Sequence, residues 1–181
     1  EAVTWSYLLH TVELPMEMKE LPNEVQVTGK NKAGGVSVAH LFSSAKTEQA
    51  IADTFFCAPT NWKNVTNAQG KALKYPNHWH FSSTTVPCKV ARFLTVMDTH
   101  GNNRPDMKVV RNGNTVQVGD WVINCNLAEK GKAAITVTNK SEKVSLNYDA
   151  GKKEGATIVT DQIKGKQISK VLTDYLPDFE I

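Results

Sequence analysis

The sequence predicts an all-β protein, an antiparallel two-sheet β-sandwich with about ten or more short strands. Short runs of alternating apolar and polar residues recur along the chain, and polar turns separate them. A helical period is almost absent before the tail. One turn, Asn112-Gly113, is a strong hairpin signal because both residue types tolerate positive φ.

The strand pattern can be followed from the first residues to the tail. The expected strands are Val3–Leu14, Val25–Thr28, Val36–Ser43, Lys46–Phe56, His78–Thr84, Val90–Met97, Lys108–Arg111, Thr115–Val118, Trp121–Leu127, Ala133–Thr138, Val144–Tyr148 and Thr157–Thr160. Lys46–Phe56 also fits a helix, and its β-rich context favours a strand. The tail has apolar residues at helical spacing, which indicates a short C-terminal helix or a docked extended tail. These residues are Ile168, Val171, Leu172, Tyr175 and Leu176.

Val90–Met97 is apolar on both sides of a strand. One side carries Val90, Leu94 and Val96, and the other carries Ala91, Phe93 and Met97. A strand of this kind belongs in the middle of a sheet that is covered on both faces. We therefore predict that it is the central core strand, with Arg92 and Asp98 near its ends, where their charges reach water.

Composition limits the class of protein. The chain of 181 residues is 40% hydrophobic, which is too high for a disordered chain, and its length predicts a single domain, residues 1–181. No apolar run approaches the roughly 20 residues that a bilayer requires, so we expect no membrane span. The formal charge of +3 is spread along the chain, which argues against a nucleic-acid partner.

Three cysteines occur, Cys57, Cys88 and Cys125, without a metal-ligand spacing. Cys125 alternates in phase with Trp121 and Ile123, which predicts a buried apolar thiol. A disulfide between Cys57 and Cys88 stays open as an alternative.

Glu1 opens directly into a strand pattern, without a basic leader region or an initiating methionine. We therefore expect the chain to be the C-terminal fragment of a larger multidomain protein. A fragment can lack the chemistry of its parent.

His78-Trp79-His80 is the sharpest local signal. Residues at i and i+2 of a strand point the same way, so we expect Trp79 and Phe81 to face the core and both histidines the opposite side. Two such histidines could share a metal ion, but no third ligand is indicated, and a polar face is the simpler interpretation. Elsewhere, His10 and His40 are expected to be hydrogen-bonded sheet residues.

The long irregular region Ala58–Pro76 carries lysines between aromatic residues. Aromatic rings stack on apolar sugar faces and lysines hold acidic groups, whereas the simpler interpretation is that the rings cap the end of the core. The candidate carbohydrate contacts in and beside this region are Trp62, Lys63, Lys74, Tyr75, His78 and His80. Nucleophile-elbow, Walker and Rossmann glycine patterns are absent from the sequence.

Several short motifs resemble one family. They are Trp5–Thr11 (WSYLLHT), Asn77–His80 (NHWH), Arg92–Asp98 (RFLTVMD) and Val116–Leu127 (VQVGDWVINCNL). They are similar to the C-terminal β-sandwich of heparinase II/III-like polysaccharide lyases, over about Val3–Tyr148. In those enzymes a strand with W-x-x-H closes the lyase β-domain, and a later F-L-T-V strand precedes the last hairpins.

The resemblance implies a bacterial multidomain parent that is periplasmic or secreted. Such a parent has an α/α-toroid before this segment and cleaves acidic polysaccharide by β-elimination. The reaction needs neutralisation of the uronate carboxylate, a base for the C5 proton and an acid for the leaving O4. The family's catalytic tyrosine, histidine and asparagine lie in the toroid and the early β-domain. No position here matches those motifs, so we assign no catalytic residue, no metal ligand and no cofactor.

The expected function is therefore a non-catalytic β-sandwich that braces the upstream catalytic domains of the same polypeptide and contacts acidic polysaccharide. An autonomous carbohydrate-binding module is the first alternative. A small metal-dependent enzyme centred on His78 and His80 is the second.

Overall fold

The computed structural model describes residues 1–12, 14–53, 66–71, 78–128, 130–149, 158–163 and 166–171. Over these residues the protein is all-β, as predicted: every paired strand is antiparallel and no helix occurs. The chain divides into two compact units, Glu1–Asp106 and Met107–Ile181, and each is described by itself. The expectation of a single domain stays a prediction.

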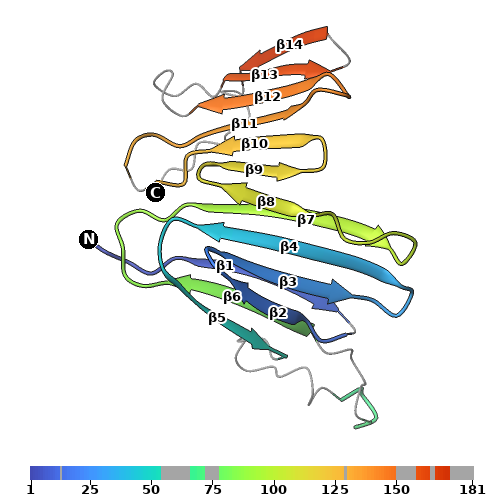
Figure 1. Cartoon of the computed structure of the whole chain (residues 1–181). Helices are drawn as coiled ribbons and strands as arrows, with labels where there is room; N and C mark the ends of the chain where they lie inside the picture. Colours follow the sequence, from blue (N-terminus) through green and yellow to red (C-terminus); the bar gives the residue numbers. More distant parts are fainter. Residues whose placement is uncertain are drawn as a thin grey trace. The chain divides into compact units, whose positions relative to one another are not determined.

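The first unit is a two-layered β-sandwich (Figure 1). One sheet has the strand order β1-β6-β5 and the other the order β2-β3-β4-β7. The strands are β1 Ser6–Val12, β2 Glu17–Leu21, β3 Glu24–Lys30, β4 Gly35–Ser43, β5 Thr47–Ala52, β6 His78–Thr85 and β7 Phe93–Gly101. The described part of the ambiguous segment Lys46–Phe56 thus contains a strand, β5, as its context favoured, while residues 54–56 lie outside the described residues.

The core of this sandwich forms where side chains of the two sheets meet. Val27 and Leu41 of one sheet pack with Phe81 of the other, and all three are buried. Tyr7 on β1 and Phe93 on β7 also face each other, with ring centroids 6.0 Å apart. These contacts confirm the predicted sandwich, because alternation places one face of each strand against the opposite sheet.

The prediction of a central strand at Val90–Met97 is wrong. The strand β7 begins three residues later and is the last strand of its sheet, paired with β4 among the described strands. Val90 is 40% exposed and Met97 is 56% exposed. The central position belongs to β4, which is buried from Val38 to Phe42. Apolar residues on both sides of a strand indicate that other parts of the protein can cover both faces of the sheet. They do not distinguish an inner strand of the sheet from an edge strand.

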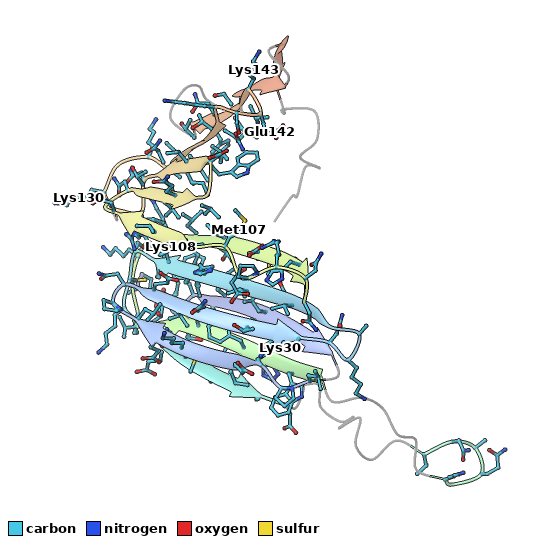
Figure 2. All side chains as sticks on the ribbon, turned by 45° about the vertical axis from the view of Figure 1, so that its right-hand side comes forward. Lys30, Met107, Lys108, Lys130, Glu142 and Lys143 are labelled. Carbon is cyan, nitrogen blue, oxygen red and sulfur yellow. The ribbon has the colours of Figure 1, made fainter. Side chains whose placement is uncertain are left out.

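The second unit is a single seven-stranded sheet in which neighbours along the chain are neighbours in space. Its strands are β8 Val109–Asn112, β9 Thr115–Val118, β10 Trp121–Cys125, β11 Ala134–Asn139, β12 Val144–Asp149, β13 Ile158–Ile163 and β14 Lys166–Val171. The predicted hairpin at Asn112-Gly113 is present: Asn112 pairs with Thr115, and Gly113 has a φ of 59°. Figure 2 shows Glu142 and Lys143 in the turn between β11 and β12, where Lys143 has a φ of 52°.

Pairing in this unit gives the sheet an apolar face and a polar face. Val116 pairs with Ile123, and Ile123 pairs with Val137, so these three side chains share one face. Cys125 is on this face too, in phase with Trp121, but its thiol is half-buried rather than buried as predicted. The opposite face carries Thr115, Gln117, Asn124, Thr136 and Thr138.

Two elements differ from the sequence prediction. The charged edge strand β2 was not predicted, because its residues EMKEL lack the alternation of a half-buried strand and all but Leu21 are exposed. Ile168 and Val171 lie in strand β14, so the helical interpretation is wrong for this part of the tail. Leu172, Tyr175 and Leu176 lie outside the described residues.

Candidate functional site

The predicted histidine face is on the β1-β6-β5 sheet. Trp79 packs against the core and Phe81 is fully buried, as predicted, so the alternation of β6 places His80 on the other side. His10 is the cross-strand neighbour of His80, and their rings are stacked with centroids 6.0 Å apart and planes 30° apart. His78 occupies the register position opposite Val12. Of the predicted histidine pair, the structure therefore describes the side chain of His80, and it adds His10.

This sheet face is rich in small polar groups. Ser6 and Thr84 are paired across β1 and β6, and their hydroxyl oxygens are 2.9 Å apart. Ser82 lies between Leu8 and Ala50 in the register, one step from the His10–His80 pair. Hydroxyl and imidazole groups on a flat sheet face can exchange hydrogen bonds with a polyhydroxylated ligand. We call this surface the histidine face.

The other predicted carbohydrate contacts fall outside the described residues. They are Trp62, Lys63, Lys74 and Tyr75. The same holds for Cys57. Cys88 has a free thiol in the structure, which does not support the alternative of a disulfide between Cys57 and Cys88. Within the described residues, no group of three or more His, Cys, Asp or Glu side chains could hold a metal ion. The described part of the chain also has no helix long and apolar enough to cross a membrane.

A cleft of about 360 Å³ opens at one end of the sandwich, between the β2–β3 turn and the β4–β5 connection. Glu20, Asn23 and Glu24 line one side, while Lys46 and Thr47 belong to the other. The turn that shapes it is tight because the non-glycine residue Asn23 adopts a φ of 63°. The cleft is polar and open to solvent, without an aromatic residue among those that line it.

Glu24 also holds His40, a residue of β4. Oε1 of Glu24 is 2.6 Å from Nδ1 of His40, and the side chains are only 13% and 7% exposed. The expectation that His40 is a hydrogen-bonded sheet residue is thereby confirmed. Its Nε2 is buried and has no hydrogen-bond partner among the described residues.

A charged cluster at the end of β7 was not anticipated from the sequence. Asp98 was expected to reach water, but it is only 5% exposed. Both of its carboxylate oxygens accept hydrogen bonds from the guanidinium of Arg104, one from Nη1 at 3.0 Å and the other from Nη2. The guanidinium of Arg104 compensates the cost of burying this carboxylate, because a buried carboxylate requires a charged partner. The dense run of charged and polar residues from Asp98 to Asp106 was the available sequence signal.

His100 completes this cluster. Its Nδ1 lies 2.6 Å from the carbonyl oxygen of Gly101, and its Nε2 lies 2.9 Å from Oδ1 of Asp106. The hydrogen bond to Gly101 first, and then that to Asp106, raises the pKa of His100 above its ordinary value. We call Asp98, His100, Arg104 and Asp106 the β7-end cluster.

Large apolar side chains are exposed just before the start of β1 and just after the end of β6. Val3 forms an isolated bridge with Cys88, and the amide of Trp5 donates to the hydroxyl of Thr85 at 3.0 Å. Val3 and Trp5 are each 46% exposed, and Val86 is 40% exposed. We call Val3, Trp5 and Val86 the apolar edge.

No protein-family model matches the chain, and a search of curated proteins finds no match either.

Proposed function

We propose that this chain is the non-catalytic β-sandwich of a heparinase II/III-like polysaccharide lyase that degrades acidic polysaccharide by β-elimination. It braces the catalytic domains of the same polypeptide and contacts the glycan. On this proposal the parent works in the periplasm or outside the cell, where polysaccharide substrates are found.

The apolar edge is the observation that carries the bracing role. Exposed apolar residues that gather in one region mark surfaces covered by another protein part. Here three large side chains are exposed on the first residues and on the segment after β6, two stretches that pair with each other. If a neighbouring domain of the parent covered these side chains, their burial would stabilise the contact by roughly 25 cal/mol per Å² of apolar surface.

The motifs that resemble the lyase family support the same proposal, since they fall on structural elements rather than on a reactive site. Trp5–Thr11 contributes most of β1, and Arg92–Asp98 contributes the first part of β7. Val116–Leu127 covers most of β9 and all of β10. These strands build sheets and carry no acid–base pair in a cleft.

The histidine face supports the glycan-contacting role. This surface of hydroxyl and imidazole groups, next in sequence to the segment that contains Trp62 and Tyr75, has the donors and acceptors that a polysaccharide requires. The same face favours the second candidate function, an autonomous carbohydrate-binding module.

Calorimetric titration with heparin, chondroitin sulfate and alginate tests the binding role. We expect wild-type protein to bind at least one of these glycans, with weaker binding after His80→Ala and after Trp62→Ala. Val110→Ala is the matched control, because Val110 is exposed on a strand of the second unit and takes no part in the histidine face. Wild-type protein that binds none of the three contradicts the glycan-contacting role and eliminates the autonomous module.

A further inference from the structure

Charged side chains of the segment that follows β7 contact side chains of β7 itself. Arg104 donates to both oxygens of Asp98, and its Nη1 also donates to the carbonyl oxygen of Pro105 at 3.0 Å. Asp106 is attached separately, through Nε2 of His100 at 2.9 Å. Asp106 is also the last residue of the first compact unit, and Met107, labelled in Figure 2, is the first residue of the second.

The hydrogen-bond geometry favours the protonated form of His100. A carbonyl oxygen lies beside Nδ1 and a carboxylate oxygen lies beside Nε2. An ionised carboxylate and a carbonyl can only accept, so both contacts are hydrogen bonds at the same time only when both ring nitrogens carry a proton, as in the imidazolium. Its side chain is only 5% exposed, so water is poorly placed to replace either partner.

We propose that His100 is a proton-operated latch: the protonated ring holds Asp106 against the end of β7, and loss of one proton releases it. A neutral imidazole has one N–H group, so one ring nitrogen then presents a lone pair to an oxygen. The carbonyl of Gly101 belongs to β7 and is fixed by the sheet. The carboxylate of Asp106 is 50% exposed, so it is the partner that moves into water.

The charged groups that act on His100 are Asp98, Arg104 and Asp106. Asp98 Oδ2 lies 3.9 Å from Nε2 and favours the imidazolium, whereas Arg104 opposes it. The contact between Asp98 and Arg104 is not part of the His100 transition, because guanidinium stays protonated and donates to both oxygens of Asp98. The release is therefore confined to Asp106 and the residues next to it.

The direction of the pH dependence follows from the raised pKa of His100. The folded protein binds this proton more tightly than the unfolded chain, whose histidines have the ordinary pKa of 6.5. The contribution of the latch to folding stability is therefore fully present below that value. It is lost as the pH rises through the higher pKa of the folded state.

NMR titration of the full chain tests the latch. We expect a pKa above 6.5 for the His100 ring, and a fall in the heteronuclear NOE of the Asp106 amide as the pH passes through that pKa. Asp106→Asn should lower the pKa of His100 and abolish the pH dependence of the NOE. The matched control is Asp120→Asn, a carboxylate of the second unit whose Oδ2 accepts from Ser141 at 3.0 Å; it should leave the pKa of His100 unchanged.

Two results would overturn the latch. One is a His100 pKa at or below 6.5 in wild-type protein, which shows that the ring is not held as an imidazolium. The other is an Asp106 NOE that stays constant across the titration of His100, which shows that protonation does not control the segment. Both readouts come from the wild-type chain, so they do not depend on the folding of any variant.

Discussion

Asp98 shows how a single buried charge determines the structure around it. Its side chain is 4% exposed, and the guanidinium of Arg104 is the cation that both of its oxygens contact. Removing one partner of such a pair leaves the other charge buried without compensation. A solvent-exposed ion pair behaves differently, because water replaces the lost partner at little cost.

Arg104→Met should therefore destabilise the protein more than Lys30→Met. Lys30, labelled in Figure 2, donates to Glu17 at 3.0 Å, but the side chains of this pair are 47% and 70% exposed. We expect the exposed pair to contribute about 0–1 kcal/mol. Urea denaturation of the two variants at neutral pH measures the difference in the free energy of unfolding. Equal losses would show that the contact between Arg104 and Asp98 is no stronger than a surface pair.

At the scale of elements, the second unit shows how alternation sorts side chains between two faces. Val116 on β9 is 1% exposed, whereas Val110 on β8 is 46% exposed. The register puts Val116 opposite Arg111, while Val110 is opposite Gln117. The two valines thus belong to opposite faces of one sheet.

Val116→Thr and Val110→Thr make a matched pair of substitutions. The exchange keeps β-branching and volume and replaces one methyl group with a hydroxyl. We expect Val116→Thr to lower the free energy of unfolding by about 1–3 kcal/mol, since the new threonine hydroxyl would be buried without a hydrogen-bond partner. Val110→Thr should change it by less than about 0.5 kcal/mol. Similar effects at both positions, measured by thermal or urea unfolding, would contradict the assigned faces.

Local patterns predicted most strands of the second unit because its hairpins are short. Gly119 and Asp120 form a two-residue turn between β9 and β10, and Gly119 has the positive φ of 56° that favours glycine. In contrast, the order of strands in the first unit depends on pairings between distant segments, such as β1 with β6. Alternation within β7 contains no information about such pairings, which is why its edge position was missed.

The candidate site was predicted only in part for a similar reason. His80 could be placed on one face of its strand from its neighbours Trp79 and Phe81. Its stacking with His10 depends on a register between residues 70 positions apart in the sequence. The contacts of Asp98 with Arg104 also depend on the path of a loop, which periodicity does not determine.

At the scale of the whole molecule, the described residues combine a sandwich, a separate amphipathic sheet and polar surfaces without a metal-binding group. On the function proposed above, these parts form a scaffold that holds a glycan or another domain. The cleft of the first unit is lined by carboxylate, amide, hydroxyl and ammonium groups.

The absorbance of unsaturated uronate tests this account most directly. The purified chain is incubated with heparin, chondroitin sulfate and alginate, and an active polysaccharide lyase serves as the positive control. The account predicts that the absorbance stays at the level of the glycan alone with every substrate. A steady rise that scales with the concentration of this chain would contradict it, because β-elimination would then be carried out by residues of this polypeptide.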